Sequence, residues 1–320
     1  MPGGHAQTVW VRLCRPPRAY GYEREVLATP DGDEVMLDHL PGPAGGPRVI
    51  LLHGLEGSAH SLHVTRVAGL VARAGGRVTV LNFRSCARDP SDLSRRLPNR
   101  RPRLYHSGET GDLDLVVSTL AAREPGSPMA AVGISLGGNV LLKWLGERGA
   151  GSPVRAAAAL SVPYDLATAS SFLERRVGAF YTEHFLRTLR EKALQVLARF
   201  PDEAGPLSAD RIRGARTFTA FDDHVTAPLH GFASAAEYYA RASSLGFLSR
   251  IAVPTLCLSA ADDPFSPPET LPRAWQAASS TVDFQVTPRG GHVGFVAGRW
   301  PWRAHYWGEQ QAVAWVLKHL

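Results

Sequence analysis

Ser135 is the residue best placed to do chemistry, because it stands between two glycines in Gly133-Ile134-Ser135-Leu136-Gly137. The apolar run before it and the helix-forming residues after it predict a strand, a tight turn and a helix. A serine on such a turn needs small neighbours two positions away, and the helix N-terminus directs free N–H groups at the reacting atom. In a chain with 31 glycines this pattern could also arise by chance, so other residues must support a nucleophilic Ser135.

A serine hydroxyl becomes a useful nucleophile when a histidine removes its proton and a carboxylate orients that histidine. Downstream of Ser135, Asp263 follows the predicted strand around Thr255 to Leu258, and His292 lies in a glycine-flanked stretch after the predicted strand Val282 to Val286. A histidine among glycines suits a loop better than a helix or strand. The order Ser135, Asp263, His292 is that of an α/β-hydrolase triad.

Two neighbouring carboxylates, Asp262 and Asp263, compete for the third position. Asp263 precedes a proline, and the following Ser266-Pro267-Pro268-Glu269 predicts a helix that begins with Ser266 as N-cap. This places Asp263 in a short, stiff loop, so we favour it over Asp262, which we expect in solvent or bonded to the loop backbone.

The stretch His53-Gly54-Leu55 should approach the same turn from the neighbouring strand. The backbone N–H groups of Leu55 and Leu136 are therefore expected to form an oxyanion hole. A structural role for His53, shaping this loop, is favoured over proton transfer. His60 and His63 have no third ligand at suitable spacing and are interpreted as surface residues, so no metal and no cofactor are expected.

Several continuous apolar runs alternate with helical patterns, which predicts a mostly parallel, doubly wound sheet opened by an antiparallel hairpin. The runs are 48–52, 77–84, 129–134, 156–162 and 253–258. Between residues 166 and 250 the pattern is helical only. The predicted fold is therefore an α/β-hydrolase core (1–165 and 251–320) with an inserted helical cap (166–250), although an extra packing layer without a role in substrate choice is the alternative.

Composition and charge exclude several classes of function. The 320 residues are 44% apolar and carry a net charge of +6, but the arginines are dispersed among 29 acidic residues, so nucleic-acid binding is not expected. The arginine-rich stretch 95–103 is interpreted as a solvated loop, with an anion-docking patch as the alternative. Three distant cysteines, Cys14, Cys86 and Cys257, suggest neither disulfides nor zinc. We expect a cytoplasmic protein without an integral membrane segment.

The chain resembles the YheT-like α/β-hydrolases in strings spread over nearly its whole length: His53 to Ser58, Asn82 to Arg84, Tyr105 to Thr110, Gly133 to Asn139, the Phe221-Asp222-Asp223 and Thr226-Ala227-Pro228 segment, Gly231-Phe232, Tyr238-Tyr239, Asp262 to Phe265 and Gly290 to His292. The resemblance implies a serine carboxylesterase with Ser135, Asp263 and His292 as its triad. The chain departs from the family at Ser85-Cys86-Ala87-Arg88, where the family usually has Gly-Cys-x-Gly.

The expected function is a serine hydrolase that cleaves carboxylic esters through an acyl-enzyme on Ser135. The resemblance implies small-molecule substrates such as short- to medium-chain acyl esters, monoacylglycerols or phospholipids. Two alternatives are acyl transfer to an alcohol on the same triad and a binding protein without turnover. Transient contact with a lipid surface and the oligomeric state are left open.

Overall fold

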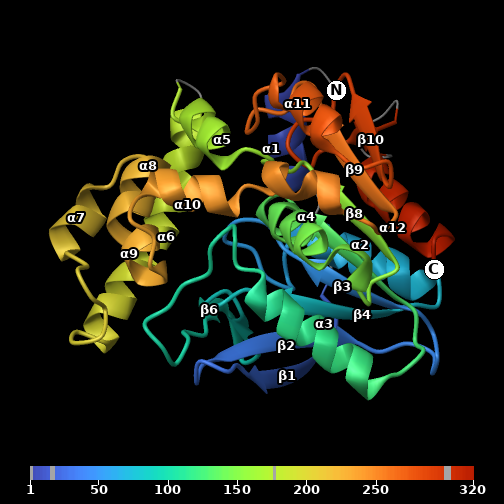
Figure 1. Cartoon of the computed structure of the whole chain (residues 1–320), viewed down its shortest axis with the longest axis horizontal. Coiled ribbons are helices and arrows are strands. Elements are labelled where there is room, and N and C mark those ends of the chain that lie inside the picture. Colours follow the sequence, from blue (N-terminus) through green and yellow to red (C-terminus); the bar gives the residue numbers. More distant parts are fainter. Residues whose placement is uncertain (1–2, 15–18, 176–177, 299–303) are drawn as a thin grey trace.

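The computed structural model describes residues 3–14, 19–175, 178–298 and 304–320. Its eight-stranded sheet has the order β1-β2-β4-β3-β7-β8-β9-β10 (Figure 1). The strands are β1 (Glu23–Ala28), β2 (Glu34–Leu40), β3 (Arg48–Leu52), β4 (Arg77–Asn82), β7 (Met129–Ile134), β8 (Ala156–Leu160), β9 (Thr255–Ala260) and β10 (Val282–Thr287). At one edge of the sheet, β2 pairs antiparallel with both β1 and β4. The other neighbouring strands, in the order β4-β3-β7-β8-β9-β10, are parallel. The predicted doubly wound sheet with an edge hairpin is confirmed.

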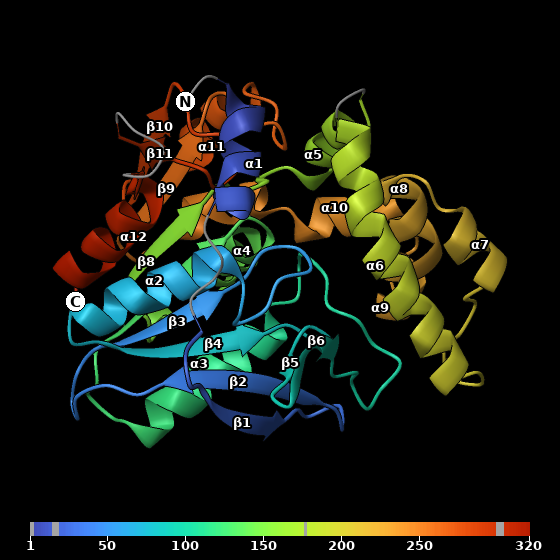
Figure 2. The same ribbon diagram turned by 180° about the vertical axis from the view of Figure 1, so that it is seen from behind.

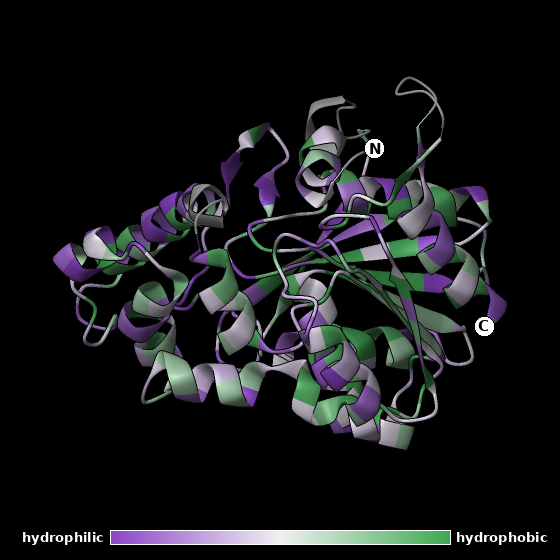
Figure 3. Cartoon of the chain, turned by 90° about the horizontal axis from the view of Figure 1, so that it is seen from above, coloured by the Kyte–Doolittle hydropathy of each residue, from purple (hydrophilic) through white to green (hydrophobic). Residues whose placement is uncertain are grey.

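The central strands are apolar without alternation because both faces of the sheet are covered. Ile50 and Leu52 of β3 pack toward α3 (Gly111–Arg123), α4 (Leu136–Arg148) and α11 (Thr270–Ala277). Val49 and Leu51 face α2 (Leu62–Arg73) and α12 (Trp307–Lys318). Figure 3 shows these strands mostly green between the helix layers.

Between β8 and β9, the part of the chain that the structure describes contains helices joined by turns and irregular segments, and no strand. Residues 166–250, called the helical insertion below, contain α5 (Leu166–Leu173), α6 (Gly178–Arg199), α7 (Ala209–Gly214), α8 (Phe218–Phe221), a π-helical turn (Asp222–Thr226), α9 (Ala227–His230), α10 (Ala235–Ala242) and a 3₁₀ segment (Ser244–Arg250). Figures 1 and 2 show α5 to α10 gathered at one side of the sheet. Much of the insertion has its own apolar cluster, built around α6.

Two expectations about local structure are wrong. The arginine-rich stretch is not all loop, because a small hairpin of β5 (Arg88–Asp89) and β6 (Asp92–Arg96) includes its first two residues, and Arg96 is largely buried. The helix expected from Ser266 begins instead at Thr270. Ser266 and Pro267 each precede a proline, which disfavours helical backbone at both positions.

The sequence motifs did not predict an N-terminal helix, but residues Gly4–Cys14 form one, α1. Figures 1 and 2 both place α1 beside α11, next to the loops that follow β9 and β10. Short strands β11 (Val296–Ala297) and β12 (His305–Tyr306) pair after β10. Within the described residues, no helix is both long and apolar enough to cross a bilayer.

Candidate active site

Ser135 occupies a strained turn between β7 and α4, with φ 53° and ψ −119°. The flanking glycines are required by close backbone contacts. A Cβ on Gly133 would lie 2.5 Å from the carbonyl oxygen of Gly137, and a Cβ on Gly137 would lie 2.5 Å from that of His53. The turn therefore exposes the Ser135 hydroxyl at the end of β7, as the spacing predicted.

The structure brings Ser135, His292 and Asp263 together from three separate loops. His292 Nε2 lies 2.9 Å from Ser135 Oγ, and His292 Nδ1 lies 2.9 Å from Asp263 Oδ2. In a neutral imidazole this arrangement puts the proton on Nδ1, where it is donated to Asp263, and leaves Nε2 to accept from the serine. The geometry is that of a serine nucleophile with its base and orienting acid.

Asp262, the competing carboxylate, faces the backbone of the histidine loop. Its Oδ1 accepts the N–H groups of Gly290 (2.7 Å) and Gly291 (2.8 Å). Gly291 has a φ of +60°, which favours glycine. Asp262 therefore shapes the loop that presents His292, which is one of the two places expected for it.

Helix α1 supports the same loop from the other end of the sequence. Thr8 Oγ1 accepts the N–H of His292 (2.8 Å), and Gln7 Oε1 accepts the N–H of Val296 (3.0 Å). A Cβ on Gly291 would lie 2.3 Å from the carbonyl oxygen of Gly4, so the two segments pack without a gap. Sequence reasoning missed this role because nothing in the spacing of these residues indicates a partner 284 positions away.

Phe265 forms the side of the site that faces the helical insertion. Its ring stacks on that of His292, with centroids 4.2 Å apart and planes 18° apart. It also contacts Tyr181 and Phe185 of α6, at 4.8 and 6.1 Å between centroids. The insertion thus contacts the candidate base through one aromatic side chain.

The expected oxyanion donors lie beside Ser135. Leu136 is the first residue of α4, and a Cβ added to Gly54 would lie 3.3 Å from Ser135 Cβ, so the loop that carries Leu55 approaches the nucleophile closely. Across the described part of the chain, no hydrogen bond uses the N–H of Leu55 or Leu136. Both groups are therefore positioned to receive a developing oxyanion.

His53 is buried and has structural contacts at both ring nitrogens. Nδ1 donates to the carbonyl oxygen of Gly54 (2.8 Å) and Nε2 accepts the N–H of Phe83 (3.1 Å). Burial lowers the pKa of His53 to about 4, so the ring is neutral near pH 7. These contacts fit the expected role of shaping the loop.

A cavity of about 530 Å³ opens from Ser135 and His292 into the helical insertion. Its wall is mainly apolar and includes Leu173, Phe185, Leu189, Phe218, Phe221, Val225 and Leu229. Asp222 is a polar exception. Burial raises its pKa to about 6, and the hydroxyls of Tyr239 and Thr226 donate to its carboxylate, each at 2.6 Å. The cavity suits a ligand with an apolar chain and a group that reaches Ser135.

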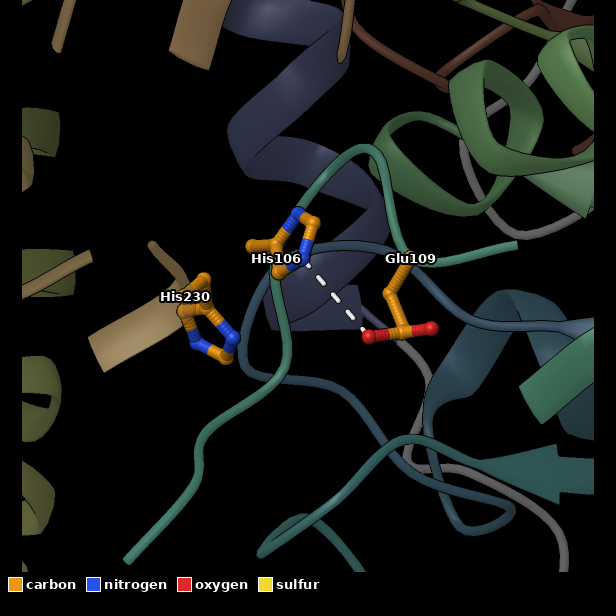
Figure 4. A group of neighbouring side chains, drawn as sticks. All are labelled: His106, Glu109 and His230. Carbon is orange, nitrogen blue, oxygen red and sulfur yellow. Dashed lines mark ion pairs between the residues drawn. The ribbon is translucent and has the colours of Figure 1, made fainter. Parts of the chain in front are cut away.

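Three possible metal ligands, His106, Glu109 and His230, lie together with one ligand atom of each within 4.8 Å of the others (Figure 4). His106 Nδ1 accepts the N–H of Gly108 (3.1 Å), so its Nε2 carries the proton and faces Glu109 at 3.6 Å. A metal-bound histidine normally donates from its other ring nitrogen, which the Gly108 N–H prevents. Arg103 also pairs with Glu109. The hydrogen bonds of this group therefore do not suit a cation.

The expectation that His60 and His63 are simple surface residues is wrong. His63 lies in the first turn of α2, half-buried, with Nδ1 2.9 Å from Glu309, a carboxylate of α12 that is fully buried. His60 precedes the helix, and its ring meets the edge of Tyr22 at 5.6 Å. Both histidines are therefore partly buried against residues of the core.

The sequence and the fold both match known hydrolases. The family described as alpha/beta hydrolase fold matches residues 47–298. The chain is 35% identical over 99% of its length to YheT of Escherichia coli (strain K12), a protein provisionally named as an esterase, of which it covers 91%. It is 31% identical over 89% of its length to the phospholipase ABHD3 of Mus musculus, of which it covers 69%. The esterase Pf2001 of Pyrococcus furiosus superimposes with a TM-score of 0.58 at 16% identity, over 95% of this chain and 99% of that one.

Proposed function

Because the chain belongs to the YheT-like α/β-hydrolases, we propose that it is a serine carboxylesterase that forms an acyl-enzyme on Ser135. The observation that carries the proposal is the 2.9 Å separation of His292 Nε2 from Ser135 Oγ, with Asp263 on the opposite nitrogen of the same ring. A hydroxyl in this arrangement loses its proton as it attacks a carbonyl carbon.

In the proposed mechanism, Ser135 Oγ attacks the ester carbonyl while His292 takes the hydroxyl proton. The N–H groups of Leu55 and Leu136 stabilise the oxyanion of the tetrahedral intermediate. His292 then gives its proton to the leaving alcohol, and the acyl group stays on Ser135. Water, activated by the same histidine, releases the acid and restores the enzyme. Asp263 stabilises the charged imidazole at each transfer.

The proposed substrates are small-molecule esters with short- to medium-length acyl chains, including monoacylglycerols. The mainly apolar wall of the 530 Å³ cavity supports this class, and the similarity to the mouse phospholipase favours phospholipids as further candidates. We propose that residues 166–250 act as a cap that sets acyl preference, since Leu173, Phe185 and Leu229 of this segment line the cavity. The buried thiols of Cys86 and Cys257 are free, which suits a reducing cytoplasm; the side chain of Cys14 lies outside the described residues.

Labelling and turnover test the proposal together. A fluorophosphonate should modify the protein at one site, identified as Ser135 by peptide mass spectrometry, and p-nitrophenyl esters of increasing chain length should be hydrolysed. Ser135→Ala should abolish both reactions. Equal labelling of the parent and Ser135→Ala would refute the nucleophile. Absence of turnover for every ester would favour a binding protein, and ester formation when glycerol is added would favour acyl transfer.

A further inference from the structure

We propose that Lys192 of the helical insertion is a positioning residue for the oxyanion hole, because it holds Glu56, the residue that follows the donor Leu55. The inference rests on the proposed function for its catalytic consequence. Its structural part, a buried link between the insertion and the loop 54–57, stands on contacts that can be measured without turnover.

The backbone of Glu56 is strained and is held by contacts from other elements. Its φ of 57° is unfavourable for a residue with a side chain. Its N–H donates to the hydroxyl of Tyr105 (2.7 Å), and its carbonyl oxygen accepts from Arg96 (3.1 Å). Glu56 follows Leu55 directly in the chain. Any relaxation of the Glu56 backbone would therefore shift the Leu55 peptide, and with it the N–H group proposed as an oxyanion donor.

The side chain of Glu56 is fixed by two cations, one on each carboxylate oxygen. Its Oε1 accepts from Lys192 Nζ at 2.7 Å and from the Tyr105 hydroxyl at 2.9 Å, while Oε2 pairs with Arg96. The side chains of Glu56 and Lys192 are each only 6% exposed. Burial acts to raise the pKa of Glu56, but Lys192 and Arg96 outweigh it and hold the pKa at about 2. The carboxylate is therefore charged near neutral pH.

Lys192 comes from the middle of α6, so this ion pair ties the insertion to the core. The Leu55 side chain adds a second contact between the core and the insertion. It packs against the apolar cluster that contains Ile50 and Leu52 of β3, and also against the apolar cluster built around α6. Lys192 Nζ also lies 3.1 Å from the buried Cys86 Sγ, so its position is fixed from the core side as well. The position of α6 is thus transmitted to the peptide units on either side of Leu55.

Lys192→Met is the informative change, because it removes the ammonium group and keeps most of the apolar stem. Glu56 keeps Arg96 as a charged partner, so the variant does not bury an unpaired carboxylate. Arg190→Met is the matched control. Arg190 is also a cation of α6, but it contacts Glu183 and the carbonyl oxygen of Ala215, both inside the insertion.

Two measurements separate positioning from simple stabilisation. Hydrogen exchange of the amides in 54–57 should be at least tenfold faster in Lys192→Met than in the parent, and unchanged in Arg190→Met. With active sites titrated by fluorophosphonate, kcat for a short p-nitrophenyl ester should fall roughly 10- to 100-fold in Lys192→Met, less than is typical for complete loss of an oxyanion donor. KM should change less than about threefold, because Leu55 N–H acts mainly on the transition state.

The outcomes distinguish this inference from the proposed function. If the amides of 54–57 exchange faster in Lys192→Met but the parent hydrolyses no ester, the link between Lys192 and Glu56 is supported and the proposed esterase function is refuted. Parental exchange and parental kcat in Lys192→Met overturn the inference while the esterase stands, as does an equal loss of kcat in both methionine variants. If Lys192→Met does not fold, Lys192→Gln takes its place in both assays, with the same expected direction.

Discussion

Replacing Asp263 by Asn tests the triad most directly. Both carboxylate oxygens of Asp263 lie close to His292 Nδ1, at 2.9 and 3.1 Å, and Oδ1 also accepts the N–H of Phe265 at 2.8 Å. Asparagine has nearly the same volume, so the loop should keep its shape. Its amide N–H₂, however, can donate to Nδ1 and stabilise the tautomer with the proton on Nε2, which then cannot accept the proton of Ser135.

The expected loss follows from that change of tautomer. We expect kcat to fall by about three to four orders of magnitude, equivalent to about 4 to 5.5 kcal/mol of transition-state stabilisation. KM should stay within about threefold, because Asp263 lies behind the His292 ring and is not part of the cavity wall.

Asp262→Asn is the matched control, since it makes the same chemical change one residue away. The oxygen of asparagine can still accept the N–H groups of Gly290 and Gly291, so kcat should fall less than about tenfold. The assay is kcat and KM for one p-nitrophenyl ester, with active sites titrated in each variant. Reversed ranking of the two variants, or an Asp263→Asn enzyme within tenfold of the parent, would refute the assignment of the triad acid.

Three further substitutions test residues around the candidate triad. Gly137→Ala should lower the free energy of unfolding by about 1–3 kcal/mol or prevent folding, since its Cβ would lie 2.5 Å from the His53 carbonyl oxygen; urea unfolding measures this. Thr8→Val should slow fluorophosphonate labelling of Ser135 about tenfold, because the His292 N–H loses its acceptor. The helix and strand content measured by circular dichroism should stay unchanged. Burial raises the pKa of Asp222 from 3.8 to about 6, so the folded state binds this proton more tightly than the unfolded state and loses stability as pH rises from about 4 to 6. The free energy of unfolding of Asp222→Asn, relative to that of the parent, should therefore increase by at most about 3 kcal/mol over that pH range. Urea unfolding of both proteins at pH 4 and pH 7.5 measures this difference.

The parts of the fold that the sequence predicts are those with a local pattern. The runs at 48–52 and 129–134 match β3 and β7 residue for residue, because a strand covered on both faces must be apolar throughout. The candidate triad could be placed for a related reason. Parallel strands bring the loops at their carboxyl ends to one edge of the sheet, so residues just after β7, β9 and β10 are brought together by topology.

What the sequence did not predict depends on contacts between distant side chains. Neither the pairing of Lys192 with Glu56, 136 positions apart, nor the support of His292 by Thr8 leaves a periodic signal. Ser85 is a different case. Its φ of 60° favours glycine, which is the residue that the family resemblance implies at this position. The N–H and hydroxyl of Ser85 both donate to Oδ1 of Asn99, which lies in the arginine-rich stretch. A local motif indicated a departure there, but only the structure shows what compensates for it.

The contact between Thr8 and the histidine loop has a consequence for how the protein is made. A ribosome produces α1 before the loop at 290–296, and the two must meet before His292 is held in place. Contacts of such high sequence separation form late and slowly. A partly synthesised chain would therefore carry Ser135 on a formed elbow without a working base. Under the proposed function, such a chain would not hydrolyse esters until residues 290–296 have left the ribosome and met α1.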